Sequence, residues 1–253
     1  MMTRKVVIIT GGAGGIGQEL VSAFLADEAL VISVDKKPVL DVGEHALHKS
    51  LAIDLSKIAS DQRYLSLSIS EIRSLLPAGL EEMILINNAA VQRLGSVGDL
   101  TQFDWQESFN VNVSAPFFLT QGLTPELVKY SGSVLNVSSI HARLTKKEFA
   151  CYAASKAALE SLTRSLALEM SVNGITVNAV APAAIATEML LAGFNGDIEK
   201  IDALAECHPS GSIGTPGGLA SFIKNILDYK DGFLTGSIIE YNGGISAKLT
   251  DPG

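Results

Sequence analysis

Two side chains that could exchange a proton, Tyr152 and Lys156, lie four residues apart in the segment NVSSIHARLTKKEFACYAASK, residues 136–156. On an α-helix this spacing places both side chains on one face. A tyrosine with its ordinary pKa near ~10 stays protonated at neutral pH and is a poor base. A lysine ammonium nearby favours the phenolate, so the pair could serve as a general acid/base. The pair alone does not distinguish an enzyme from an ordinary helix surface.

A glycine-rich turn near the N-terminus offers a place for a cofactor. The stretch TGGAGGIG, residues 10–17, follows the β-branched run KVVIIT and precedes a segment with helical apolar spacing. Glycines keep such a turn tight and let backbone N–H groups approach a pyrophosphate at the helix N-terminus. Asp35 follows 18 residues after Gly17, where a carboxylate accepts hydrogen bonds from an adenosine ribose and repels a 2′-phosphate. The turn and the acid predict an NAD site rather than an NADP site, although Lys36 and Lys37 leave room for a phosphate.

The rest of the chain alternates strand-like and helix-like segments. Apolar runs from KVVIIT to SIIEYNGG predict seven strands. Helical apolar spacing is clearest at 15–28, 104–129, 150–172 and 215–229. Such alternation implies a parallel sheet with helices on both faces. With no repeat or composition break, we expect a single domain over residues 1–253, with a mobile substrate loop at 183–214, where no period persists.

Composition narrows the class of protein. The net charge of −8 and pI near 5.0 argue against a nucleic-acid partner, which needs a basic face. No apolar run approaches the ~18 residues needed to span a bilayer, and no basic amphipathic segment indicates membrane binding. Cys151 and Cys207 form neither a metal-binding nor a redox spacing. These features favour a cytoplasmic protein.

The order of the motifs resembles that of the short-chain dehydrogenase/reductase family over nearly the whole chain. The matching segments are TGGAGGIG, AIDLS at 52–56, NNAA at 87–90, NVN at 110–112, NVSS at 136–139, YAASK at 152–156, NAVAPAAIATEM at 178–189 and FLTGSIIEYNGG at 233–244. The resemblance implies an α/β fold of the Rossmann type. That fold is a three-layer αβα sandwich around a doubly wound parallel sheet of about seven strands.

The resemblance also implies roles for individual residues. Tyr152 would be the general acid/base, Lys156 its electrostatic partner and ribose ligand, and Ser139 the catalytic serine. Asn112 would hold a water beside Lys156. The implied cofactor site comprises Gly11, Gly14, Gly15, Ile16, Gly17, Asp35, Asp54, Leu55, Asn88, Tyr152, Lys156, Ile185 and Thr187. Within it, Asp54 and Leu55 would flank the adenine, Asn88 would stabilise the sheet beside the cofactor, and Ile185 and Thr187 would contact the nicotinamide carboxamide and the pyrophosphate.

The implied reaction is hydride transfer between a nicotinamide and a secondary alcohol or ketone, with a proton passing through Tyr152. The charges of Lys156 and of oxidised nicotinamide would favour the phenolate. Lowering the tyrosine pKa by about two to three units requires on the order of 3–4 kcal/mol. A serine hydrolase built on Ser139 and His141 is less consistent with the sequence, because no G-x-S-x-G elbow is present.

The chain departs from the family pattern in three places near the cofactor, and the mildest is NNAA at 87–90 in place of the commoner Asn-Asn-Ala-Gly. Ala183 follows Pro182 where the family usually has glycine, which adds a methyl group beside the nicotinamide pocket. Only 19 positions separate Asp35 from Asp54, which leaves little room for the helix usually found there. The adenosine end is therefore expected to be more open than usual.

The substrate is less well specified. The candidate substrate contacts are Gln92, His141 and Phe149. Arg143 and Lys146 add basic character, which suits a sugar, polyol or hydroxy acid as substrate. The alternative is that these two residues are solvated loop residues without contact to a substrate. One alternative is an NADPH-dependent reductase of 3-oxoacyl-carrier-protein or quinone substrates. Another is a cofactor-binding regulator without catalysis. The resemblance further implies a homotetramer, or a homodimer, built on the helices around 104–129 and 150–172.

Overall fold

One seven-stranded parallel sheet forms the centre of the protein, as described by a computed structural model that covers residues 4–37, 45–194 and 196–249. Every neighbouring pair of strands is parallel, in the order β3-β2-β1-β4-β5-β6-β7. The strands are β1 (Lys5–Thr10), β2 (Leu30–Asp35), β3 (His48–Ala52), β4 (Glu82–Asn87), β5 (Ser133–Val137), β6 (Thr176–Pro182) and β7 (Ile238–Tyr241). The predicted Rossmann-type fold with about seven strands is confirmed.

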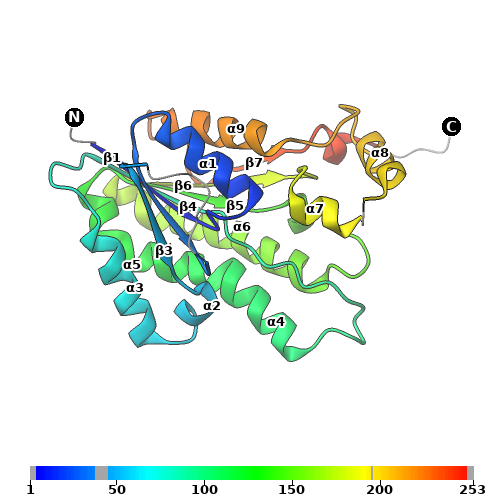
Figure 1. Ribbon diagram of the computed structural model, residues 1–253, viewed down its shortest axis with the longest axis horizontal. Coiled ribbons are helices and arrows are strands. Elements are labelled where there is room, and N and C mark those ends of the chain that lie inside the picture. The colour runs from blue at the N-terminus through cyan, green and yellow to red at the C-terminus, as the bar shows by residue number, and fades with distance from the viewer. Residues whose placement is uncertain (1–3, 38–44, 195, 250–253) are drawn as a thin grey trace.

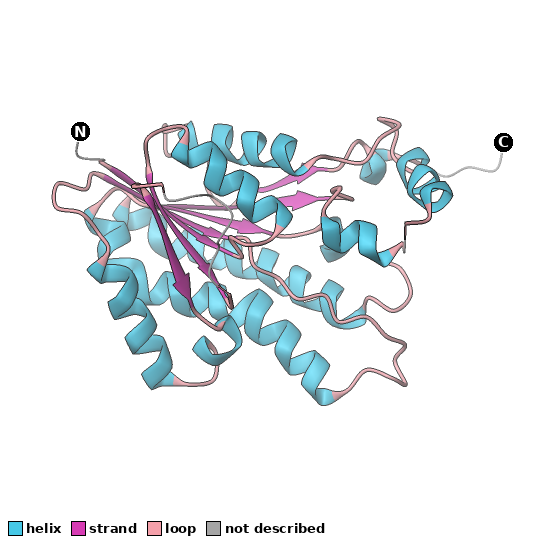
Figure 2. Cartoon of the chain, in the orientation of Figure 1, coloured by secondary structure: helices cyan, strands magenta, loops and turns pink. Residues whose placement is uncertain are grey.

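Helices cover both faces of this sheet (Figures 1 and 2). On one face lie α1 (Gly15–Leu25) and α9 (Pro216–Asp228), and the other face carries α2 (Leu55–Ile58), α3 (Gln62–Ser74), α5 (Ala115–Lys129) and α6 (Ala150–Met170). Side chains alternate along β1, so Val7 and Ile9 pack under the first set while Val6 and Ile8 pack under the second. The near-continuous apolar strands of the sequence follow from this burial on both faces.

The strand order reverses between β1 and β4. The chain runs outward from β1 through β2 to β3, then returns to β4 on the other side of β1 and continues to β7. Because all strands are parallel, Thr10, Asn87, Val137 and Pro182 end at the same edge of the sheet. Open α/β sheets bind ligands in the crevice at such a reversal point.

Several helices differ from the predicted ranges. The helix predicted at 104–129 consists of α4 (Gln102–Phe109), a π-helical turn (Asn110–Ser114) and α5. The segment 183–214, predicted as a loop, contains two short helices, α7 (Glu188–Gly193) and α8 (Ile198–Glu206). The stretch between Asp35 and Asp54 was expected to leave little room for a helix. Residues 45–53 of it form a turn and β3, and residues 38–44 lie outside the described part of the chain.

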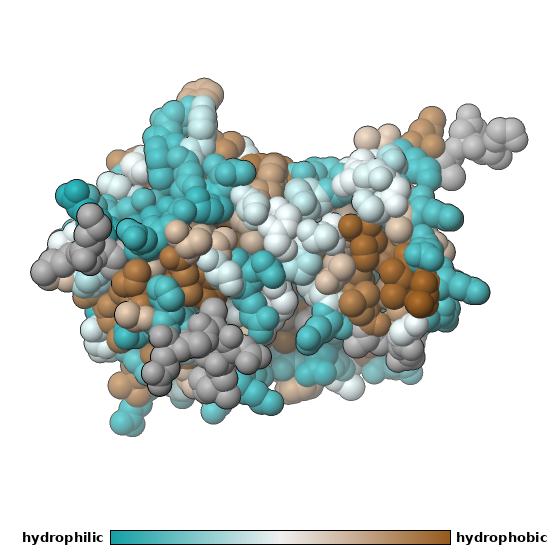
Figure 3. Space-filling view, turned by 45° about the horizontal axis from the view of Figure 1, so that its top comes forward, coloured by the Kyte–Doolittle hydropathy of each residue, from teal (hydrophilic) through white to brown (hydrophobic). Residues whose placement is uncertain are grey.

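The surface is mixed in polarity. Figure 3 shows hydrophobic side chains gathered in separate groups on one face, with hydrophilic side chains between them. Across the described ranges, no helix combines the length and apolar character needed to cross a membrane.

Candidate active site

The glycine-rich turn lies between the carboxyl end of β1 and the start of α1. Gly11 adopts φ +69°, and a Cβ at Gly17 would lie 2.0 Å from the Gly11 carbonyl oxygen, so glycine is required at both positions. Asn88, just after β4, donates from Nδ2 to the carbonyls of Thr10 (3.0 Å) and Gly11 (3.1 Å) and so holds the turn to the sheet. No side chain caps α1 at Gly14, which leaves its first N–H groups available to an anion.

The acid at the end of β2 faces this turn. Asp35 Oδ2 accepts a hydrogen bond from the backbone N–H of Ala13 at 3.1 Å. Lys36 Nζ lies 3.7 Å from Asp54 Oδ1 and 3.8 Å from Glu107 Oε1, so its charge is shared between two carboxylates. These contacts, with the glycine turn, form a cradle that fits a dinucleotide bound by its pyrophosphate and adenosine ribose.

Four predicted cofactor residues lie in different surroundings. Leu55 is only 6% exposed and packs in the core, so its side chain offers little surface to an adenine ring, and its place beside the adenine stays a prediction. Ile185 is also buried and pairs with Gly214 in an isolated parallel bridge. Thr187, in contrast, lies beside the glycine turn, because a Cβ at Gly15 would be 3.5 Å from its Cγ2. Ile16 packs partly buried against the core cluster beneath α1.

The structure brings Ser139, Tyr152 and Lys156 together at the carboxyl edge of β5. Ser139 precedes a 3₁₀ turn (Ile140–Ala142), and its Oγ accepts from the backbone N–H of His141 at 3.2 Å. Lys156 Nζ lies 5.7 Å from the centre of the Tyr152 ring and donates to the Val137 carbonyl at 2.7 Å. Both come from α6, as the spacing of four predicted.

Burial governs the pKa values of this pair. Burial raises the pKa of Tyr152, and a hydrogen bond from the Ser139 side chain opposes that rise. Burial lowers the pKa of Lys156 to about 7, because the residue is only 1% exposed. The sequence argument expected a lowered tyrosine pKa from the charges of Lys156 and oxidised nicotinamide. That expectation is not met by the side chains alone, since burial disfavours both charged forms.

Asn112 lies in the π-helical turn and is fully buried. Its Oδ1 accepts from the backbone N–H of Val91 at 2.8 Å, and its Nδ2 donates to the Val91 carbonyl and to Ser155 Oγ, both at 2.9 Å. The side-chain amide is therefore bonded to protein groups, and the expected water beside Lys156 stays a prediction. It fastens the segment after β4 to α6, one residue before Lys156.

An aromatic cluster borders Tyr152. The His141 ring stacks on Phe149 at 4.3 Å and meets Tyr152 edge-on at 6.0 Å, and Lys146 Nζ lies 4.6 Å from the Phe149 ring centre. The pKa of His141 is lowered by burial and, less strongly, by Lys146. The cluster thus places two of the three predicted substrate residues beside Tyr152. Gln92 is exposed on the segment after β4.

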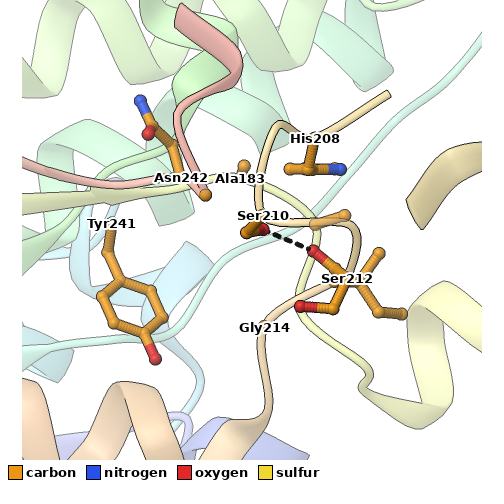
Figure 4. A pocket seen from close by; sticks show the side chains of 10 residues that line it. Ala183, His208, Ser210, Ser212, Gly214, Tyr241 and Asn242 are labelled. Atoms are coloured by element: carbon orange, nitrogen blue, oxygen red, sulfur yellow. Dashed lines mark hydrogen bonds between the residues drawn. The ribbon is translucent and has the colours of Figure 1, made fainter. Parts of the chain in front are cut away.

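A cavity of about 270 Å³ opens at the ends of β6 and β7 (Figure 4). Its walls come from Ala183 and Ala184 after β6, from the turn after β7, and from the segment joining α8 to α9. Ser210 Oγ donates to the Ser212 carbonyl at 3.2 Å within this wall. The cavity confirms neither a substrate nor a cofactor role, but the predicted substrate loop at 183–214 supplies most of its lining.

Sequence reasoning missed three polar residues of the site: Glu107, Ser155 and Glu160, each at most 6% exposed. Glu107 Oε2 accepts a hydrogen bond from Arg93 Nε at 2.6 Å, and Glu160 Oε1 accepts one from Ser138 Oγ at 3.3 Å. A charged residue within an apolar helical pattern is a signal for such buried pairs, but the pattern does not give the partner. No group of three or more potential metal ligands occurs among the residues that the structure describes.

Comparison with known proteins gives a consistent result. The model of the family described as short chain dehydrogenase matches residues 5–195. Protein FixR from Bradyrhizobium diazoefficiens is 35% identical over 95% of this chain and 86% of its own length. Galactitol 2-dehydrogenase (L-tagatose-forming) from Cereibacter sphaeroides is 29% identical over 93% of this chain and 92% of its own.

Solved structures show the same fold. 4-Hydroxyisoleucine dehydrogenase complexed with NADH has a TM-score of 0.85 and 27% identity, over 97% of this chain and 100% of its own. ElxO with NADP bound also has a TM-score of 0.85, over 98% of this chain and 100% of its own, and at 24% identity it shows likeness of fold alone. These neighbours hold nicotinamide dinucleotides, the ligand class that the cradle at the glycine turn fits.

Proposed function

The chain belongs to the short-chain dehydrogenase family, and we propose that it oxidises a secondary alcohol or reduces the matching ketone, with Tyr152 as general acid/base. The observation that carries the proposal is the placement of Tyr152, Lys156 and Ser139 at the carboxyl edge of a sheet that also holds the dinucleotide cradle. A bound nicotinamide would take up or supply the hydride. The chain's own side chains handle the proton and the orientation of the substrate.

The proton passes through the Tyr152 hydroxyl. In the oxidative direction its phenolate accepts the proton of the substrate hydroxyl, and in the reductive direction its phenol donates a proton to the carbonyl oxygen. Ser139, hydrogen-bonded to Tyr152, holds the reacting oxygen beside the phenol and stabilises charge that develops there. Lys156, when protonated, favours the phenolate. Because the Lys156 pKa is about 7, this assistance changes across neutral pH.

We assign NAD as the preferred cofactor. Asp35 presents its carboxylate beside the glycine turn, where it would repel a 2′-phosphate. Lys36, which could have offset that repulsion, already lies within 4 Å of Asp54 and Glu107. Fluorescence titration with NADH and NADPH should show tighter binding of NADH. Replacing Asp35 by serine should lower the ratio of the NADPH Kd to the NADH Kd by at least about tenfold. If the unchanged protein binds NADPH more tightly than NADH, the assignment is contradicted.

The proposed substrate is a small hydroxylated compound, namely a sugar, polyol or hydroxy acid. Two similar proteins are named for such substrates, galactitol and 4-hydroxyisoleucine. The aromatic cluster with Lys146 beside Tyr152 provides both a stacking surface and a cation for them. Arg143 offers a substrate less positive charge than an unpaired arginine would, because its guanidinium forms ion pairs with Glu160 and Glu240.

The test is a screen of alcohols with NAD and NADP and of ketones with the reduced cofactors, followed at the reduced-nicotinamide absorbance. Turnover of a polyol or hydroxy acid with NAD is the expected result. Exclusive turnover of 3-oxoacyl or quinone substrates with NADPH would favour the reductase alternative. NADH binding without turnover across the screen would favour a regulator and overturn the catalytic proposal.

We further propose that the chain is a single domain that assembles as a homotetramer or homodimer through α4, α5 and α6. Exposed apolar side chains on two of these helices support an interface, namely Phe103 (63%) and Trp105 (48%) on α4 and Leu168 (79%) on α6. Light scattering coupled to size exclusion should give a mass of two or four chains. A monomer at micromolar concentration would contradict the assembly but leave the catalytic proposal intact.

A further inference from the structure

Arg143 bridges two carboxylates from distant parts of the chain. It belongs to the segment 139–148, which joins β5 to α6 and begins with Ser139. Its Nε lies 3.4 Å from Glu160 Oε2 on α6, and its Nη1 lies 2.8 Å from Glu240 Oε1 on β7. The side chain of Glu160 is only 5% exposed, and a carboxylate so buried is costly unless it is paired. Arg143 therefore holds this segment to two elements of the fold.

The Glu160 arm of this bridge leads directly to the catalytic residues. Ser138 Oγ donates to Glu160 Oε1 at 3.3 Å and lies 3.5 Å from the carbonyl oxygen of Lys156. Ser138 is itself 2% exposed and immediately precedes Ser139. The buried carboxylate of Glu160 thus binds both Arg143 and Ser138, the residue before Ser139. Through Ser138 it is also connected to the turn of α6 that carries Lys156.

The Glu240 arm leads to the cavity at the end of β7. Glu240 Oε2 accepts a hydrogen bond from Asn242 Nδ2 at 2.6 Å and another from Ser246 Oγ. Asn242 lines the cavity shown in Figure 4. The two arms connect the segment that follows Ser139 with the far wall of that cavity.

The Glu240 arm alone adds little to stability, because the side chains of Arg143 and Glu240 are 48% and 34% exposed and water weakens exposed ion pairs. The location of the bridge is more telling, because the same short segment carries Ser139 and His141. His141 meets the Tyr152 ring edge-on, and its backbone N–H donates to Ser139 Oγ. A shift of the segment would move both groups relative to Tyr152.

We propose that Arg143 is a positioning residue, which acts through Glu160 and Glu240 to hold Ser139 and His141 in place against Tyr152. The assignment rests on the proposed function of Tyr152 as general acid/base. Misplacement of reacting groups by about 1 Å costs on the order of 100-fold in rate, so the loss of Arg143 is expected to lower kcat by about 10- to 100-fold. NADH affinity should stay within about twofold, because Arg143 has no hydrogen bond or ion pair with the glycine turn.

The experiment compares three variants, Arg143→Ala, Arg143→Lys and Glu160→Gln, with one control. The control is Arg164→Ala, which lies on α6 one turn after Glu160. Arg164 is exposed, and no ion pair is found for it among the described residues. Three quantities are measured: the Kd of NADH by fluorescence, kcat and KM on the substrate found by the screen, and the titration of Tyr152. The titration is followed by phenolate absorbance as a difference against Tyr152→Phe and requires no substrate.

Arg143→Ala should lower kcat more than it raises KM, and should move the Tyr152 titration to higher pH as the Ser139 hydrogen bond weakens. Arg143→Lys should recover part of both effects, and Glu160→Gln should resemble Arg143→Ala. A kcat and a Tyr152 titration equal to those of Arg164→Ala would overturn the proposal. If Arg143→Ala does not fold, the Lys and Gln variants decide by the same criterion.

The two proposals fail in different ways. Full turnover in Tyr152→Phe would remove the general acid/base role and the proposed function with it. Loss of turnover in Tyr152→Phe, together with control-like behaviour of every Arg143 and Glu160 variant, would remove only the positioning role.

Discussion

Lys156 should make the stability of the cofactor-free protein rise with pH above neutrality. Burial lowers its pKa from 10.5 to about 7 in the folded chain. Between these two values the unfolded chain binds one more proton than the folded chain, so raising the pH favours folding. The slope approaches ~1.4 kcal/mol per pH unit, and the full shift of about 3.5 units corresponds to a ceiling of about 5 kcal/mol.

The perturbation is Lys156→Met, which keeps a long unbranched side chain without a titrating amine. Urea unfolding of both proteins is measured at pH 7, 8 and 9, and the difference in free energy of unfolding is plotted against pH. The protein with Lys156 should gain about 2 kcal/mol relative to the variant between pH 7 and pH 9. Subtraction removes other titrating groups, such as Cys151, whose pKa is raised by burial.

The matched control is Lys147→Met, at an exposed position two residues before Phe149. It measures how the loss of an exposed lysine charge by itself changes the free energy of unfolding at each pH. A flat difference curve for Lys156→Met would refute the reasoning, because it would mean that the buried amine keeps its ordinary pKa.

Two further predictions concern the cofactor turn and the π-helical turn. Gly17→Ala should weaken NADH binding at least about tenfold and destabilise the fold by about 1–3 kcal/mol, since its Cβ would overlap the Gly11 carbonyl. Gly193→Ala, with no atom near its Cβ, is the control for titration and urea unfolding, and equal behaviour of the two would contradict the prediction. Asn112→Ala should lower the free energy of unfolding by about 1–3 kcal/mol, because the Val91 backbone groups lose their buried partners. An unchanged urea midpoint would show that those groups are satisfied in another way.

The sheet and its glycine turn could be predicted because their signals are local. Continuous apolar strands, a turn that only glycine fits at Gly17, and an acid at the end of the second strand all follow from neighbouring residues. The hydrogen bond from Ala13 to Asp35 brings the two predicted parts of the dinucleotide site together. The spacing of Tyr152 and Lys156 on one helix is local in the same way.

Features that depend on distant partners could not be predicted. The π-helical turn at Asn112 is stabilised by hydrogen bonds to Val91 and Ser155, which lie 21 and 43 residues away. The short helix α8 has no fully buried residue, and its start is marked chiefly by the N-cap Asp197, whose Oδ1 accepts a hydrogen bond from the Lys200 N–H. Sequence spacing also gave no sign that a side chain such as Leu55 would face the core.

Arg143 shows the same limit at the active site. Its type and position favoured a basic substrate mouth, whereas its partners lie 17 and 97 residues away and reduce its free charge. Burial acts in the same non-local way on the catalytic pair. It raises the pKa of Tyr152 and lowers that of Lys156, against the effect of the Lys156 charge that the sequence indicated.

The most direct test of the account is the Tyr152→Phe variant, which removes only the phenol hydroxyl. The account predicts NADH binding within about twofold of the unchanged protein and a loss of turnover of at least about 100-fold. Both are measured on one preparation, by fluorescence titration and by absorbance of the reduced nicotinamide. Undiminished turnover would contradict the assignment of Tyr152 as the general acid/base.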